Sequence, residues 1–166
     1  MNSQTENRAP YIPNEEEERR TIIRKYRQLL TAVYHKTSVE DRKTIKKAFM
    51  FATNAHNGVR RRSGEPYIYH PISVAMICCK EMNLGTTSVV CALLHDVVED
   101  TEYTLDDMRD MFGDKVATII DGLTKIEDLV FDKRNISIQA ENFKKIFLSM
   151  LKDVRVIMIK LADRLH

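Results

Sequence analysis

The chain of 166 residues contains 26 Lys+Arg and 24 Asp+Glu, and 43% of its residues are hydrophobic and 30% charged. This composition excludes disordered and collagen-like chains, and the length predicts one domain with a real hydrophobic core. A formal net charge of +2 excludes a protein that mainly coats nucleic acid. We therefore expect no direct nucleic-acid binding by this domain.

The cysteines and the N-terminal residues indicate the cellular compartment of the protein. Cys78, Cys79 and Cys91 are odd in number and lack CxxC spacing, which fits neither a disulfide framework nor a thiolate zinc site. Residues 1–13 are polar, contain two prolines and no signal-peptide pattern, and are predicted to be a flexible tail. The longest apolar run, residues 89–94, is far shorter than the ~20 residues of a membrane span. We expect a cytoplasmic protein without membrane contact.

The first two predicted helices have clear N-terminal signals. Asn14 is placed to cap a helix whose first turn, residues 15–18, is all glutamate, and the helix dipole favours negative charge there. A second helix is predicted to start at the capping box of Ser38 and Asp41. Its apolar stripe ends with His56, which we therefore expect to face the core.

The next segment interrupts the helical pattern. Residues 57–69 contain two glycines, one proline and three consecutive arginines, and predict a basic loop. His70 and Pro71 restart a helix that Gly85 ends. Residues 89–101 are predicted to be helical, although their valines also suit a buried strand, because no second strand is visible to pair with them.

Helices continue to the end of the chain. A capping box at Thr104 begins one helix, Asp114 caps the next, a connector is expected at 125–136, and two more helices follow at 139–151 and 154–166. The sequence thus predicts an all-α multi-helix bundle, in which residues 14–166 form one domain. The last apolar pattern has no stop signal, so we expect a C-terminally truncated chain.

Four polar residues occupy apolar positions of three predicted helices: His56, His95, Asp96 and Asp163. Taken singly, each has an ordinary explanation, because a buried histidine is more often a hydrogen-bonded core residue than a ligand, and an aspartate can pair with a neighbouring arginine. Together they supply two imidazoles and two carboxylates, a mixed set that suits Mn, Fe, Ni or Zn and leaves positions for water and substrate. We therefore expect a metal site.

Two further carboxylates follow this set by one helical turn. Glu99 is four residues after His95, and Asp100 is four residues after Asp96, so each is predicted to share a helix face with an expected ligand. A carboxylate in this place can take a proton from a metal-bound water and later give one to a leaving oxygen.

The arginine run at residues 60–62 lies close to His56 in sequence and is therefore expected near the mouth of the site. Most charge runs are simply solvated surface. Here the flanking glycines and the following Tyr67 favour phosphate binding with base stacking, because guanidinium groups bind phosphate through two hydrogen bonds and stack on aromatic rings.

Four blocks carry a resemblance to a known family: AHNGVRRRSGEPYIYHP at 55–71, ALLHDVVEDT at 92–101, GDKVATIIDGLTKI at 113–126 and QAENFKKIFLSMLKDVRVIMIKLADRLH at 139–166. In this order they resemble the N-terminal hydrolase domain of the Rel/SpoT alarmone enzymes, which belongs to the HD superfamily of metal-dependent phosphohydrolases. The resemblance covers nearly the whole chain after about residue 20.

The resemblance implies an Mn²⁺-dependent hydrolase that removes the 3′-pyrophosphate of the guanine nucleotide (p)ppGpp and yields GDP or GTP. It implies metal ligands at His56, His95, Asp96 and Asp163. It places the catalytic pair at Glu99 and Asp100, and substrate contacts at Arg61, Arg62, Ser63 and Tyr67. It also implies a parent protein with GTP pyrophosphokinase activity that associates with the ribosome through other domains.

The chain departs from the family pattern at few places. Val59 stands where relatives often have Gln, Arg62 stands where they commonly have Lys, and the family motif continues with Asn beyond His166. Two alternatives stay open: an HD phosphohydrolase acting on another nucleotide, and a catalytically silent regulatory HD domain. The intact HDVVED segment argues against the second.

Overall fold

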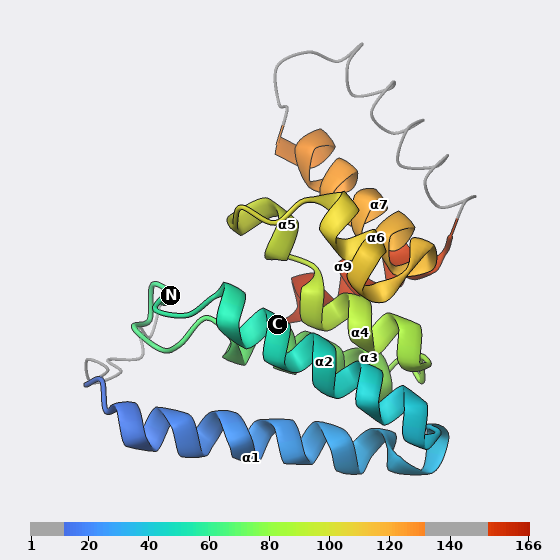
Figure 1. Ribbon diagram of the computed structural model, residues 1–166. Coiled ribbons are helices and arrows are strands. Elements are labelled where there is room, and N and C mark those ends of the chain that lie inside the picture. Colours follow the sequence, from blue (N-terminus) through green and yellow to red (C-terminus); the bar gives the residue numbers. More distant parts are fainter. Residues whose placement is uncertain (1–11, 132–152) are drawn as a thin grey trace, which may run out of the picture.

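The computed structural model describes residues 12–131 and 153–166 (Figure 1). Within these ranges the chain forms helices and no β-strand, which confirms the predicted all-α fold. The helix predicted at 139–151 and nearly all of the tail predicted at 1–13 lie outside the described residues. None of the helices in the described ranges combines the length and apolarity needed to cross a bilayer.

The elements in chain order are α1 (Glu15–Val33), the 3₁₀ turn η1 (Tyr34–Lys36), α2 (Val39–Ala55), α3 (Tyr69–Lys80), α4 (Thr86–Leu94), α5 (Val97–Asp100), α6 (Leu105–Phe112), α7 (Asp114–Phe131) and α9 (Arg155–Leu165). Helix α1 runs along one edge of the molecule, and α6 and α7 lie at the opposite end (Figure 1). Helix α4 lies between them and packs against α2, α3, α7 and α9.

Three of the predicted N-terminal caps are confirmed, whereas α7 begins at Asp114 itself, so the prediction of Asp114 as a cap is wrong. The Asn14 side-chain oxygen accepts a hydrogen bond from the Glu17 backbone N–H. Both capping boxes form: the Ser38 and Thr104 hydroxyls each accept from the backbone N–H three residues later, and the aspartate there accepts from the cap residue in return. Each cap satisfies backbone donors that the first turn of a helix leaves free.

Helix α4 is the centre of the core. Every residue from Ser88 to Leu94 is buried, as expected for a helix surrounded by others, and the prediction of helix over strand is confirmed. The predicted single helix over 89–101 is, however, broken: α4 ends at Leu94 and α5 begins at Val97. Asp96 adopts φ −93° and ψ −4°, which turns the chain, so His95 and Asp96 lie at a bend between two helices.

Helix α7 is longer than expected, because it continues to Phe131 where a connector was predicted from residue 125. Ile126 is buried and extends the apolar stripe beyond Leu123. Lys125 also forms an ion pair with Asp121 one turn earlier. Both contacts favour continuation of the helix, and no proline interrupts it.

Candidate metal centre

Three side chains from distant parts of the sequence meet in one cluster. His70 in the first turn of α3, His95 at the end of α4 and Asp163 in the last turn of α9 each offer one ligand atom, and these atoms lie within 4.8 Å of one another. Both histidines are buried and Asp163 is half-buried. The packing of α9 against α3 and α4 brings them together.

Asp96 supplies a second carboxylate to the same cluster. Its Oδ2 lies 3.0 Å from His95 Nε2 and 3.8 Å from His70 Nε2. On the other side, Asp163 Oδ1 lies 3.0 Å from His70 Nε2 and 3.6 Å from His95 Nε2. Two imidazole nitrogens and two carboxylate oxygens thus converge, which is a donor set that divalent transition metals accept.

The imidazole of His95 is oriented by the backbone. Its Nδ1 lies 2.8 Å from the Ala92 carbonyl oxygen, which acts as acceptor and leaves Nε2 to face the cluster. His95 Nε2 is buried and, among the described residues, makes no hydrogen bond of good geometry despite its closeness to Asp96. A buried nitrogen that points at carboxylates in this way fits a metal ligand.

The ring of His70 is held in a comparable way. Its Nδ1 lies 3.0 Å from Nδ1 of His166, so the Nε2 atom is the one that faces the two carboxylates. On the far side of Asp163, the Lys160 ammonium lies 3.2 Å from Oδ2. His70 and Asp163, like His95, therefore each have a neighbour that fixes their orientation.

The electrostatics of the cluster favour a cation. Burial disfavours the charged form of His95, but the Asp96 and Asp163 carboxylates outweigh burial and raise its pKa to about 10. Burial likewise opposes ionisation of Asp96, yet the neighbouring His95 holds its pKa at about 2. Burial also acts against Asp163, and the neighbouring His70 and His95 imidazoles nevertheless lower its pKa. At neutral pH both carboxylates are therefore ionised and attract positive charge.

His56 lies outside this cluster. It follows α2 as its C-cap, is 4% exposed, and its ring centroid lies 4.7 Å from that of Tyr67. Both ring nitrogens are buried and have no hydrogen-bond partner among the described residues, and burial lowers the pKa of the imidazole. The structure thus brings together three of the four expected ligands, His95, Asp96 and Asp163, and places His70 rather than His56 beside them.

Sequence reasoning missed His70 because it was interpreted only as the start of a helix. A signal was present: His70, Val74 and Cys78 are spaced by four, and the last two are fully buried. Residues at this spacing share one helix face, so the histidine had to lie on the core side of α3. His70 itself is 8% exposed.

Tyr67 connects the loop to the cluster. Its hydroxyl donates a hydrogen bond to Asp96 Oδ2. Burial, together with the charges of Asp96 and Asp100, strongly raises the pKa of Tyr67, which therefore stays protonated and keeps its donor. The residue expected to stack on a base thus also orients a ligand candidate.

The other expected substrate contacts lie on the loop before α3. Arg61 is half-buried with Nη1 3.6 Å from Glu65 Oε1, whereas Arg62 and Ser63 are exposed. Gly64 has φ +94°, a conformation that glycine adopts without strain and that lets the loop turn back. The loop therefore presents two guanidinium groups and one hydroxyl close in sequence to Tyr67.

Glu99 and Asp100 lie on α5, beyond the bend at His95 and Asp96, and both are exposed. The Asp100 backbone N–H donates to the Asp96 carbonyl oxygen at 2.9 Å, which fixes the short helix to the bend. The two expected catalytic carboxylates are thus on the solvent side of the ligand candidates, where water and a substrate can reach them.

Known proteins are similar to this chain in sequence. Residues 48–166 match the family described as HD domain. The chain is 49% identical over 125 residues to the bifunctional (p)ppGpp synthase/hydrolase SpoT of Escherichia coli K12, covering 75% of this chain and 17% of that protein. It is 45% identical over 122 residues to a GTP pyrophosphokinase of Streptomyces coelicolor, covering 74% of this chain and 14% of that one.

A solved structure is also similar. It is described as a metazoan ortholog of SpoT that hydrolyzes ppGpp and plays a role in starvation responses; the TM-score is 0.60, the identity is 30%, and the match covers 78% of this chain and 68% of that one. The curated relatives are longer, since this chain spans only 17% or less of the two named above. The chain belongs to the HD domain family and, within it, to the Rel/SpoT group.

Proposed function

We propose that this chain is an Mn²⁺-dependent hydrolase domain that removes the 3′-pyrophosphate of (p)ppGpp and yields GDP or GTP and pyrophosphate. The observation that carries the proposal is the convergence of two histidines and two aspartates, His70, His95, Asp96 and Asp163, in a chain of the Rel/SpoT group. The relatives named as guanosine-3′,5′-bis(diphosphate) 3′-pyrophosphohydrolases support the choice of substrate.

We assign His70 to the metal site in place of His56. His70 Nε2 lies 3.0 Å from Asp163 Oδ1, whereas the His56 ring packs against Tyr67. The mixed nitrogen and oxygen set of His70, His95, Asp96 and Asp163 suits Mn²⁺ and leaves positions open. A bound divalent cation would lower the pKa of water and stabilise negative charge on a phosphoryl oxygen.

Glu99 and Asp100 are the proposed acid and base that transfer protons from the attacking water and to the leaving oxygen. Water attacks the phosphorus attached to the ribose 3′ oxygen, and the bond between that phosphorus and the 3′ oxygen breaks. One carboxylate takes the proton from water, and the 3′ oxygen receives a proton as it leaves. The exposed position of both carboxylates on α5 gives them access to water and to the leaving group.

The loop before α3 binds the phosphates. Arg61 and Arg62 neutralise the pyrophosphate charge, because guanidinium groups form paired hydrogen bonds with phosphate oxygens. Ser63 adds a hydroxyl donor at the turn. Tyr67 contributes its ring at the nucleotide and its hydroxyl at Asp96, so one residue serves both substrate and metal site.

We further propose that residues 14–166 act as one hydrolase unit of a bifunctional parent, because the E. coli relative is described as a synthase/hydrolase. The experiment is to assay the chain with Mn²⁺ against (p)ppGpp, deoxynucleoside triphosphates and cyclic dinucleotides. We expect pyrophosphate release from (p)ppGpp alone. Turnover of another nucleotide without (p)ppGpp cleavage would assign a different HD phosphohydrolase, and no turnover with no Mn²⁺ binding would indicate a silent domain.

A further inference from the structure

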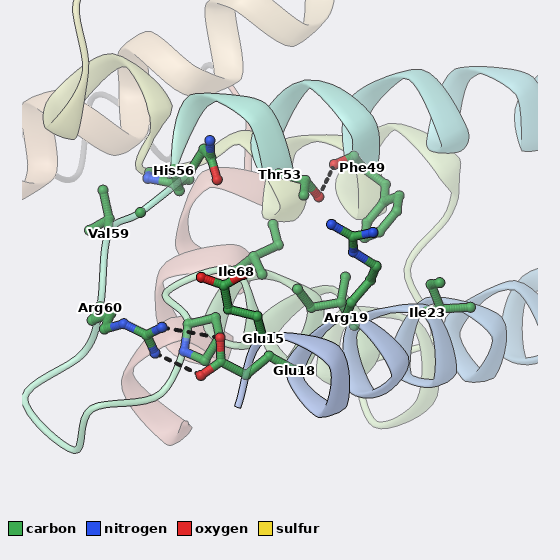
Figure 2. Close-up of a pocket in the computed structure, with 14 residues that line it drawn as sticks. Glu15, Glu18, Arg19, Ile23, Phe49, Thr53, His56, Val59, Arg60 and Ile68 are labelled. Carbon is green, nitrogen blue, oxygen red and sulfur yellow. Dashed lines mark hydrogen bonds and ion pairs between the residues drawn. The ribbon is translucent and has the colours of Figure 1, made fainter. Parts of the chain in front are cut away.

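Arg60 differs from the two arginines that follow it, because it is directed at α1. Its Nη1 lies 2.8 Å from Glu18 Oε1 and its Nη2 lies 3.1 Å from Glu18 Oε2, so the two side chains form a paired, two-bond ion pair (Figure 2). The partners are 42 residues apart in sequence. This contact therefore joins the first turns of α1 to the loop that contains Arg61, Arg62 and Ser63.

The carboxylate of Glu18 is unusual in its burial. Its side chain is 9% exposed, and Glu18 is the only buried acidic residue in the described part of the chain. A carboxylate in such a place needs a charged partner, because desolvation without compensation is costly. Two-bond guanidinium pairing supplies this compensation through two charge-assisted hydrogen bonds of defined geometry.

Arg60 also closes the loop on itself. Its Nη1 donates to the Gly64 carbonyl oxygen at 2.8 Å. Backbone bonds complete the same turn, with the Arg61 N–H donating to the Glu65 carbonyl at 2.9 Å and the Tyr67 N–H donating to the Val59 carbonyl at 3.0 Å. The Arg60 guanidinium group thus links both sides of the loop to the buried Glu18 carboxylate on α1.

The loop leads directly into the cluster of candidate metal ligands. Tyr67 follows the turn and donates its hydroxyl to Asp96, while Arg61 and Arg62 stand at the turn itself. A change in the height or tilt of the loop would therefore move the phosphate-binding groups relative to Asp96. Displacements of about 1 Å in positioning groups can change rates or binding by orders of magnitude.

We propose that Glu18 and Arg60 are positioning residues that hold the substrate loop beside the cluster of candidate metal ligands. Neither side chain is needed at the reacting atoms; the pair acts by fixing Arg61, Arg62 and Tyr67. The kinetic part of this inference rests on the proposed (p)ppGpp hydrolysis, and the structural part, that the pair fixes the loop, does not.

The test uses Arg60→Gln, Glu18→Gln and the double variant of the whole chain. With (p)ppGpp and Mn²⁺, we expect each single variant to raise KM about tenfold, equivalent to about 1.4 kcal/mol of binding, with kcat changed less than about twofold. Both substitutions break the same Glu18–Arg60 ion pair. The double variant should therefore have a KM no higher than that of Arg60→Gln. The matched control is Arg20→Gln, which removes the exposed pair of Arg20 with Glu16 on the same helix and should leave KM unchanged.

A second readout does not depend on catalysis. Amide hydrogen exchange at residues 59–67 should accelerate in both single variants, while exchange in α4 stays at the wild-type rate, which separates loop release from general unfolding. Unchanged exchange in this loop, or faster exchange with unchanged KM, would overturn the proposal. If the wild-type chain does not cleave (p)ppGpp, the proposed function fails, and the exchange experiment alone decides whether the pair holds the loop.

Discussion

Replacing either of two buried histidines with phenylalanine shows which of them is a metal ligand. His70→Phe removes the Nε2 atom that lies 3.0 Å from Asp163 Oδ1, whereas His56→Phe removes two buried nitrogens without hydrogen-bond partners among the described residues and keeps a ring beside Tyr67. We expect His70→Phe to lose Mn²⁺ binding and His56→Phe to keep it.

The magnitude follows from ligand loss. Changes in groups that only orient a ligand typically cost 10–100-fold in metal affinity, so removal of a ligand itself should cost about 100-fold or more. At an Mn²⁺ concentration of about 100 times Kd, binding stabilises the wild-type protein by about 2.7 kcal/mol, and a 100-fold weaker variant by about 0.4 kcal/mol. For a domain of this size these values correspond to a rise in Tm of roughly 5–10 °C and roughly 1 °C.

Thermal unfolding with and without MnCl₂, together with calorimetric titration of Mn²⁺, measures both effects. The EDTA-treated variants supply the reference, so that any change in intrinsic stability is subtracted. A His56→Phe protein that loses the Mn²⁺-dependent rise in Tm while His70→Phe keeps it would refute the assignment of His70 and restore His56 as the ligand.

Three further predictions concern the neighbours of the cluster. Tyr67→Phe removes the donor to Asp96 and should weaken Mn²⁺ binding about 10–100-fold in calorimetry; equal affinity would show that Asp96 needs no such support. Glu99→Gln should keep Mn²⁺ binding and lower kcat about 10²–10⁴-fold, and a variant as fast as wild type would exclude proton transfer by Glu99. The two carboxylates overcome burial and keep His95 protonated in the metal-free chain below its pKa of about 10, so Mn²⁺ must displace this proton. Affinity should therefore rise with pH towards that value, with proton release detectable in buffers of different ionisation enthalpy, whereas pH-independent affinity would contradict the coupling.

The helices could be predicted from local signals because those signals act within one turn. Asn14 and the capping boxes at Ser38 and Thr104 are recognised by residues three positions apart, and each forms as predicted. The break after Leu94 carries no such signal, because no glycine or proline marks it. It arises where Asp96 turns towards His95 and Tyr67, which are contacts made only in the folded chain.

The candidate site was predicted in part for the same reason. The grouping of His95, Asp96 and Asp163 was predicted from polar residues within apolar segments, a pattern visible in sequence. The choice between His56 and His70 depends on how α2 and α3 are placed around α4, because both histidines are buried. Burial alone therefore could not tell the histidine that faces the carboxylates from the one that packs behind Tyr67.

Product analysis after incubation of the chain with ppGpp and Mn²⁺ tests the proposed metal centre and its chemistry most directly. We expect GDP and pyrophosphate to appear in equal amounts and the reaction to stop on metal removal. We expect His70→Phe to abolish the reaction and His56→Phe to retain it. Release of inorganic phosphate instead of pyrophosphate, or full activity of His70→Phe, would contradict the proposed metal centre and its chemistry.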